Sequence, residues 1–538
     1  MDVPPFLIFY IAALLLPAVH GRARSLVLLG TPVVSALLML SWNMGERMTL
    51  DIMGLSLSPV RIDALSRLFG ILFHLAAFIG IVFALHVRDT VQHAASLVYA
   101  GSAIGAVFAG DLLTLFLFWE MLAVSSVFLI WARRTPRALA SGLRYLIIQV
   151  VSGLLLLAGV LIGVSDGRGL EFDHIGLDGM ASWLIFIAFG IKAGFPLLHN
   201  WLTDAYPEAT PTGTVFLSAF TTKVAIYALA RGFPGTELLV YIGAVMTCFP
   251  IFYAVIENDL RRVLAYSLIN QLGFMVCGIG IGTALAINGA VAHAFNDVLF
   301  KGLLLMSMGA VLYRTGKING SELGGLYKSM PKTAALCAVG AASISAFPLF
   351  SGFVSKSMVM TATLDEGHHW VWLMLLFASA GVFHHAGIKI PFFAFFSHDS
   401  GIRTEEAPRH MLIAMTLGAA LCVGIGSYPW PLYALLPYAV DYSPFDATHV
   451  IAQLQLLFFS ALAFTWLKLS GIYPPELPSV NIDSEWVYRR LAPRFVHAAV
   501  AATRRLDHVL RDALAEVAGR GAGLFGHSHG ATGTMART

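Results

Sequence analysis

Long apolar runs separated by short polar connections make up most of this chain. Each run holds roughly 20 residues with few or no charges, which is the length and composition of a membrane-spanning helix. Dividing the chain at its charged residues predicts an all-α polytopic membrane bundle of about 14–15 transmembrane helices. The runs lie near residues 5–20, 25–42, 65–86, 91–110, 112–131, 142–164, 181–203, 211–231, 236–256, 262–283, 286–313, 333–364, 370–396, 411–432 and 450–470.

Two of these runs are longer than a single span requires, and each contains the tripeptide Phe-Pro-Leu near its middle. The prolines are Pro196 and Pro348. Because proline has no backbone N–H, it breaks a helix inside the membrane and leaves a carbonyl without its partner. The two runs are five spans apart and therefore cross the membrane in opposite directions. The pattern predicts two inverted five-helix repeats with discontinuous helices at Pro196 and Pro348, as in transporters built from inverted repeats.

This pattern divides the chain into five segments. The expected segments are N-terminal transmembrane helices at 1–90, a first inverted repeat at 91–231, a second at 236–396, C-terminal transmembrane helices at 411–470 and a cytoplasmic amphipathic tail at 480–538. The tail alternates apolar and basic residues, which is typical of a helix lying on a membrane surface. Its Gly-, His- and Thr-rich end is expected to lack structure.

The composition supports a membrane protein and excludes a soluble one. The chain is 57% hydrophobic and only 12% charged, whereas soluble domains are about a quarter charged. Basic connections alternate with acidic ones, which predicts an outside N-terminus and an inside C-terminus. The expected location is a bacterial cytoplasmic membrane. The N-terminus lacks the basic region and cleavage site of a secretory signal, so a retained first span is expected. The four cysteines show no CxxC spacing, and we expect them to fill the core rather than to bind a metal or a cofactor. No nucleic-acid partner is expected.

Charged residues inside the apolar runs are the candidates for function. Lys192 lies near the middle of about 25 uncharged neighbours, where a charge is costly unless it serves a function. Pro196 frees the carbonyl of Lys192 itself, so lysine and proline mark one hydrated, polar place. His293, Asp297 and Lys301 are spaced by four and share one helix face. The candidate proton-relay residues are Glu120, Lys192, Lys223, His293, Asp297, Lys301, Lys356 and Lys389.

An acid, several lysines and histidines at membrane depth suit proton transfer, because burial and ion pairing act in opposite directions on the charged state of each group. Simpler interpretations remain for some of them. Lys389 lies near a span end, where lysines often extend to the interface. Glu120 can be a static packing partner, and His293 alone can be a core histidine. His384 and His385 are adjacent, so they point apart and at most one of them serves.

Five stretches resemble a known family, the proton-conducting membrane subunits of respiratory complex I, membrane-bound hydrogenases and Mrp-type cation/proton antiporters. They are FWEML (118–122), KAGFPLLHNWLTDAYPEATPTGTVFLSAFTTK (192–223), NDLRRVLAYSLINQLGFM (258–275), HAFNDVLFKGLL (293–304) and FPLFSGFVSK (347–356). The chain is most similar to the D-type subunits of Mrp Na⁺/H⁺ antiporters. The resemblance implies that Glu120 pairs with Lys192 and that protons pass on through Lys223, Lys301 and Lys356. Asp297 departs from the family pattern, and we expect it to hold Lys301 in its charged state.

Three functions follow. The first is the proton-translocating membrane subunit of a monovalent cation (Na⁺)/H⁺ antiporter, with other membrane subunits as partners. The second is a proton-pumping subunit of an NADH:quinone oxidoreductase-like or hydrogenase complex. The third is a membrane partner that energises a separate cytoplasmic protein. The chain has no dinucleotide-binding glycine motif, no cluster cysteines and no haem-ligand pattern, so we expect no redox chemistry in it.

Overall fold

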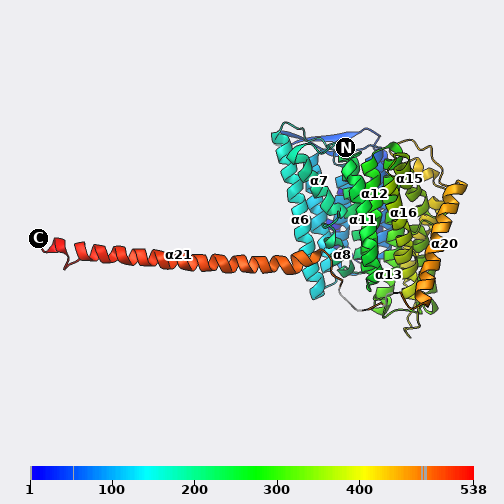
Figure 1. Ribbon diagram of the computed structural model, residues 1–538. Coiled ribbons are helices and arrows are strands. Elements are labelled where there is room, and N and C mark those ends of the chain that lie inside the picture. Colours follow the sequence, from blue (N-terminus) through cyan, green and yellow to red (C-terminus); the bar gives the residue numbers. More distant parts are fainter. Residues whose placement is uncertain (1–2, 53, 474–475, 478–480) are drawn as a thin grey trace. The chain divides into compact units, whose positions relative to one another are not determined.

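The computed structural model describes residues 3–52, 54–473, 476–477 and 481–538. The chain forms two compact units, Met1–Asn481 and Ile482–Thr538. The first unit is a bundle of apolar helices, with α6 and α7 packed together and α11 beside α12 (Figure 1). The predicted all-α membrane fold is confirmed, and the described part of the chain contains little sheet.

Twelve helices in the described residues are long and apolar enough to cross a membrane. They are α2 (Gly21–Ser41), α3 (Ala64–Phe83), α4 (Thr90–Phe108), α5 (Leu112–Trp131), α6 (Pro136–Ser165), α9 with α10 (Gly213–Gly232), α11 (Glu237–Ile256), α12 (Leu260–Ile281), α13 (Ala284–Thr315), the segment that begins with α16 (His369–Phe396), α18 (Arg409–Ser427) and α20 (Ala447–Leu469). The other three predicted spans are shorter or broken helices. They are α1 (Pro5–Leu15), α7 (Gly179–Ala193) followed by α8 (Asn200–Ala205), and α14 (Pro331–Ile344) followed by α15 (Ser351–Asp365).

The two predicted helix breaks have the same backbone geometry. Gly194 and Ala346 both adopt left-handed φ angles, of 78° and 59°, before the Phe-Pro-Leu tripeptide. The leucines that end the two tripeptides are left-handed as well, with φ angles of 69° and 72°. In each break the phenylalanine N–H donates to a carbonyl five residues earlier, at 2.9 Å and 3.1 Å. Two copies of one local structure support the predicted repeats, while the inverted relation of the halves stays a prediction.

The structure also contains interruptions that the apolar pattern does not reveal. The span at 213–232 is divided at Phe220 into α9 (Gly213–Ala219) and α10 (Thr221–Gly232). The span that begins with α16 (His369–Val382) contains two π-helical segments, Phe383–Ile388 and Phe392–Phe396, on either side of α17 (Lys389–Pro391). Such segments contain an extra residue in a helical turn and often occur at functional sites.

A small hairpin between α2 and α3 was not predicted. The strands β1 (Arg47–Ile52) and β2 (Leu55–Arg61) pair antiparallel, with Arg47 opposite Arg61. The guanidinium of Arg61 contacts Asp173 at 2.9 Å and the carbonyl of Phe172 at 2.7 Å. The hairpin therefore ties the connection before α3 to the connection before α7, both of which lie on the face predicted to be outside.

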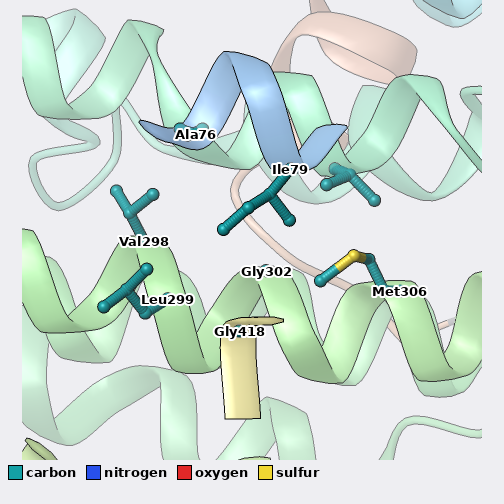
Figure 2. Close-up of a pocket in the computed structure, with 9 residues that line it drawn as sticks. Ala76, Ile79, Val298, Leu299, Gly302, Met306 and Gly418 are labelled. Carbon is teal, nitrogen blue, oxygen red and sulfur yellow. The ribbon is translucent and has the colours of Figure 1, made fainter. Parts of the chain in front are cut away.

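A small apolar cavity of about 20 Å³ lies where α3, α9, α13 and α18 meet (Figure 2). Ile79 of α3 and Val298 and Met306 of α13 line it. Gly302 opens onto it, since a Cβ added there would have no neighbouring atom within 4 Å. Gly302, which lines the cavity, follows Lys301 in the sequence, and the cavity has room for about one methyl group.

The second unit is dominated by α21 (Ala492–His529), a helix of 38 residues without a buried side chain. This helix lies within the segment predicted to form the amphipathic tail, 480–538. The predicted loss of structure in the Gly- and His-rich end is wrong as far as His529, because the helix continues through that segment. Residues 518–529 contain no proline, so every backbone N–H in this stretch can donate within the helix, although its four glycines lower the helix stability.

The same glycine-to-alanine change is expected to have opposite effects at two positions. Gly194→Ala should lower stability by about 1–2 kcal/mol, because alanine is strained in the left-handed region. Gly302→Ala should raise it by about 1 kcal/mol, because alanine favours the helix and its methyl group enters the cavity. Thermal unfolding of the purified protein in detergent measures both. Equal shifts in the same direction would contradict the conformation described for Gly194.

Candidate functional site

The eight predicted relay residues lie inside the helical bundle. Glu120 is half-buried, and the other seven are each no more than 2% exposed. They come from six different spans: α5, α7, α10, α13, α15 and the segment that begins with α16. The sequence separations between these residues reach hundreds of positions, so their common burial results from the fold. The structure does not place all of them in one chain of direct contacts.

Glu120 and Lys192 are close neighbours that do not touch directly. The Lys192 ammonium donates to the carbonyl of Trp119 at 2.5 Å and lies 4.4 Å from the centre of the Trp119 ring. Glu120 interacts electrostatically with Lys192, but the two form no direct ion pair in the described part of the chain. Glu120 Oε1 is buried without a hydrogen-bond partner there.

The space that holds the Glu120 carboxylate is provided by α6. A Cβ added to Gly153 would lie 1.5 Å from Glu120 Oε1. A larger residue at position 153 would therefore collide with the carboxylate. Gly153 therefore leaves space for the Glu120 side chain, whose Oε1 has no hydrogen-bond partner among the described residues.

Lys223 and Asp297 form a fully buried ion pair. Lys223 Nζ lies 2.5 Å from Asp297 Oδ2, and both side chains are 0% exposed. Lys223 also donates to the carbonyl of Ser218 at 3.1 Å, at the break between α9 and α10. Asp297 makes its direct contact with Lys223, whereas Lys301 donates to Ser267 Oγ at 2.7 Å and interacts with Asp297 electrostatically, so the expected role of Asp297 toward Lys301 stays a prediction. The break at Phe220, which the apolar pattern did not reveal, supplies the carbonyl that Lys223 contacts.

A hydrogen-bond chain extends from His293 across neighbouring helices. His293 Nδ1 lies 2.9 Å from Ser355 Oγ, and Nε2 lies 3.1 Å from Gln271 Oε1. Since an amide oxygen only accepts, this geometry places a proton on Nε2. The amide of Gln271 donates to Asn270 at 2.7 Å, and Asn270 donates to the carbonyl of Thr247. Sequence reasoning missed Asn270 and Gln271, although two adjacent amides inside an apolar run were a visible signal.

Lys356 lies at the second helix break, next to a larger cavity. Its ammonium donates to the carbonyl of Ile344, the last residue of α14, at 2.8 Å. A cavity of about 380 Å³ between α15, α16 and α20 is lined by Lys356 and extends to Asp365, which is exposed at the end of α15. From α20, Gln453 donates to the carbonyl of Ser345 at 3.1 Å.

The mouth of this cavity is polar. Thr361 Oγ1 lies 3.2 Å from His449 Nε2, and His449 contacts Asp446 through its other ring nitrogen. Thr361 and His449 both line the cavity. Polar groups therefore lie along this cavity between Lys356 and Asp365, which is at the end of α15 on the face predicted to be outside.

Lys389 occupies a separate place near the opposite face. Its ammonium contacts Glu476 Oε1 at 3.0 Å and the carbonyls of Val255 and Glu257, each at 2.6 Å. Lys389 thus donates hydrogen bonds to carbonyls at the C-terminal end of α11. His385, one turn earlier, is fully buried and interacts electrostatically with Lys301 and Lys389. His384 instead packs its ring against Phe464 and Tyr473, as expected for adjacent residues that point apart.

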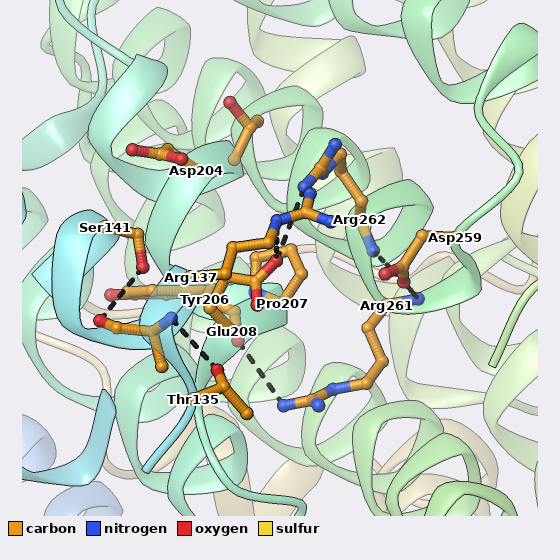
Figure 3. A network of polar contacts seen from close by, with 12 residues as sticks. Thr135, Arg137, Ser141, Asp204, Tyr206, Pro207, Glu208, Asp259, Arg261 and Arg262 are labelled. Atoms are coloured by element: carbon orange, nitrogen blue, oxygen red, sulfur yellow. Dashed lines mark hydrogen bonds and ion pairs between the residues drawn. The ribbon is translucent and has the colours of Figure 1, made fainter. Parts of the chain in front are cut away.

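An arginine cluster fixes the connection between α8 and α9 (Figure 3). Glu208 contacts Arg137 at 2.7 Å and Arg133 and Arg262 at 3.7 Å each. Arg261 is buried and donates to the carbonyl of Ala209 at 2.9 Å. These contacts hold the start of the interrupted span that carries Lys223.

Three comparisons place the chain among known proteins. It is 28% identical to hydrogenase-4 component B of Escherichia coli over 408 residues, which cover 67% of this chain and 61% of that protein. It is 31% identical to the D-type subunit of the Na⁺/H⁺ antiporter of Alkalihalophilus pseudofirmus over 309 residues, covering 52% and 62%. The chain thus spans less than two thirds of the length of these relatives. The solved Mrp complex from Dietzia sp. DQ12-45-1b matches in fold with a TM-score of 0.80 and 24% identity, over 97% of this chain and 63% of that one.

A family model described as "NADH:quinone oxidoreductase/Mrp antiporter, TM" matches residues 109–384, just over half of the chain. This range includes every predicted relay residue except Lys389. The chain is therefore a multi-pass integral membrane protein that belongs to the NADH:quinone oxidoreductase/Mrp antiporter transmembrane family.

Proposed function

We propose that this chain is the proton-translocating membrane subunit of a monovalent cation (Na⁺)/H⁺ antiporter in a bacterial cytoplasmic membrane, assembled with other membrane subunits. The observation that carries the proposal is the buried Lys223–Asp297 ion pair inside a bundle that holds five further buried candidates and the half-buried Glu120. A buried ion pair costs several kcal/mol of desolvation for each ion and is weak evidence for stability alone. Charged residues inside a membrane bundle commonly mark an ion or proton pathway.

The proposed path has a central switch. A proton that reaches Asp297 neutralises the anion that holds Lys223, so Lys223 loses its counter-ion and releases its proton toward the next acceptor. Glu120 and Lys192 form the neighbouring site, where the free Oε1 of Glu120 accepts a proton. Lys301, His293 and their hydrogen-bonded partners continue the path toward Lys356. Water molecules would bridge the gaps that no direct contact spans.

Two routes would connect the path to the membrane faces. The cavity beside Lys356 leads to the outer face through Thr361 and His449. On the inner side, His385 interacts electrostatically with both Lys301 and Lys389 and would connect them through water. In this arrangement the simpler interpretation of Lys389 as an interfacial lysine gives way to a role at the inner end of the path.

The alternative is a proton-pumping subunit of a hydrogenase or quinone-reducing complex, and the match to hydrogenase-4 component B favours it. Both functions use the same proton path and differ in the partner subunits. Purification of the chain with its native partners separates them. Iron–sulfur subunits in the purified complex would support the alternative, and small membrane subunits without redox groups would support the antiporter. Copurification of a soluble protein alone would instead support a membrane partner that energises a cytoplasmic protein.

Lys192→Arg is expected to abolish proton exchange, because arginine keeps the positive charge but does not release a proton at accessible pH. The measurement is dissipation of a pH gradient in vesicles that contain the chain with its native partner subunits, at matched expression. Lys328→Arg is the control, since Lys328 is a surface lysine paired with Asp399. Full exchange by Lys192→Arg would show that Lys192 has a structural role only.

Removing both members of the central ion pair should separate stability from transport. Lys223→Met alone leaves Asp297 buried without its partner, and we expect a loss of about 3–5 kcal/mol in stability. The double variant Lys223→Met/Asp297→Leu should unfold close to the temperature of the unaltered protein but should not transport protons. Thermal unfolding and the vesicle assay measure the two properties. A double variant that still transports at the normal rate would exclude the pair from the path.

The outer cavity is expected to be open to water. Met360→Cys, in a background without the native cysteines, should react with a membrane-impermeant thiol reagent added outside, because Met360 lines the cavity. Val359→Cys is the control on the same helix, since Val359 is 0% exposed and packs against Gly289. Reaction of Met360→Cys from the inside only would reverse the proposed direction of the route.

A further inference from the structure

A second polar cavity, of about 750 Å³, lies where the start of α2 meets the connection between α3 and α4. Its polar lining is basic or neutral. The polar residues that line it are Arg24, Ser25, His86, Arg88, His93 and Tyr313, and none of the lining residues carries a carboxylate. All the connections involved lie on the face predicted to be cytoplasmic.

Arg24 has hydrogen-bonding capacity that the protein does not use. Its Nη1 donates to the carbonyl of Arg88 at 2.9 Å. Its Nε and Nη2 are shielded from solvent and have no acceptor among the described residues. An unpaired buried donor on a charged group is costly, so the arrangement favours an acceptor from another molecule. Arg24 lines the cavity and one protein hydrogen bond holds its guanidinium, so a reorientation of this group would present these nitrogens to an anion there.

The surrounding groups add positive potential and do not cancel it. The first turn of α2 lies at the cavity through Gly21, and no side chain caps that helix end. Uncapped N–H groups at a helix start favour an anion. Asp89 is a carboxylate that interacts electrostatically with the cavity residue His93, and it makes contacts elsewhere, because it accepts from the backbone N–H of Val91 at 2.9 Å and pairs with Arg134 at 3.2 Å.

The membrane position indicates which anion fits. Beyond its first turn, α2 presents exposed apolar side chains, among them Leu26, which is 72% exposed, and Leu37, which is 64% exposed. In a membrane these side chains face acyl chains. A phosphate group in the cavity would thus lie at headgroup level, above a lipid-facing helix surface. Basic pockets between helix ends on the cytoplasmic side are suited to lipid phosphate groups.

We propose that this cavity binds the phosphate headgroup of an anionic phospholipid from the cytoplasmic leaflet. Arg24 and Arg88 hold the phosphate oxygens, and the start of α2 contributes backbone N–H donors. The site is distinct from the proton path, so the proposal does not depend on the proposed function.

The test compares Arg24→Gln with Arg22→Gln in the purified full-length protein. Arg22 is exposed in the same first turn of α2 and does not line the cavity. Phosphatidylglycerol added to detergent-solubilised protein should raise the unfolding temperature of the unaltered protein and of Arg22→Gln. Arg24→Gln should need at least about tenfold more lipid for the same rise, as expected for loss of a charge-assisted contact. Arg88→Gln, a change at an exposed residue, provides a second variant if Arg24→Gln fails to fold.

Phosphatidylcholine and inorganic phosphate separate the possible sources of the anion. The proposal expects little effect from the zwitterionic lipid and only weak stabilisation by inorganic phosphate. An equal response of Arg24→Gln and Arg22→Gln to phosphatidylglycerol would overturn it. Full stabilisation by inorganic phosphate without lipid would also overturn it, because the site would then take a soluble anion.

Discussion

Every charge inside this bundle must be compensated by the protein itself, because the surrounding hydrocarbon offers neither water nor counter-ions. The arrangement of the helices follows from this constraint. Lys223 faces Asp297, Lys192 uses the carbonyl of Trp119, and Lys356 uses the carbonyl of Ile344. Lys192 and Lys356 therefore make their direct hydrogen bonds to backbone oxygen atoms, and the Glu120 carboxylate acts on Lys192 without a direct ion pair.

Two helix breaks provide carbonyls for this compensation. An unbroken helix uses most of its carbonyls internally, although the carbonyl of Trp119 inside α5 also accepts from Lys192. Lys356 and Gln453 both donate to carbonyls at the break after α14, and Lys223 donates to the one at the break after α9. At these two breaks, one with a proline and one without, the interrupted backbone thus provides acceptors for the buried ammonium groups of Lys356 and Lys223.

The membrane spans were predictable from the sequence because hydrophobic length is a strong, local signal. The breaks at Pro196 and Pro348 were predictable for a similar reason, since proline removes a backbone donor wherever it occurs. The break at Phe220 was not, because no proline or glycine marks it and tertiary contacts such as that of Thr221 with Tyr99 stabilise it. The residue types at the site were visible in the sequence, but the pairing was not. Helical spacing favoured Asp297 with Lys301, whereas the structure pairs Asp297 with a lysine 74 positions away.

The π-helical segments around Lys389 have a mechanical consequence. Each π-helical turn holds one residue more than an α-helical turn, and α17 between the two segments is only three residues long. If one segment changed to α-helical hydrogen bonding, the residues beyond it would rotate by about 100° and shift by about 1.5 Å along the axis. His385 lies within the first segment and Lys389 follows directly after it. Such a local change of hydrogen-bonding register would turn Lys389, and the residues that follow it, relative to His385.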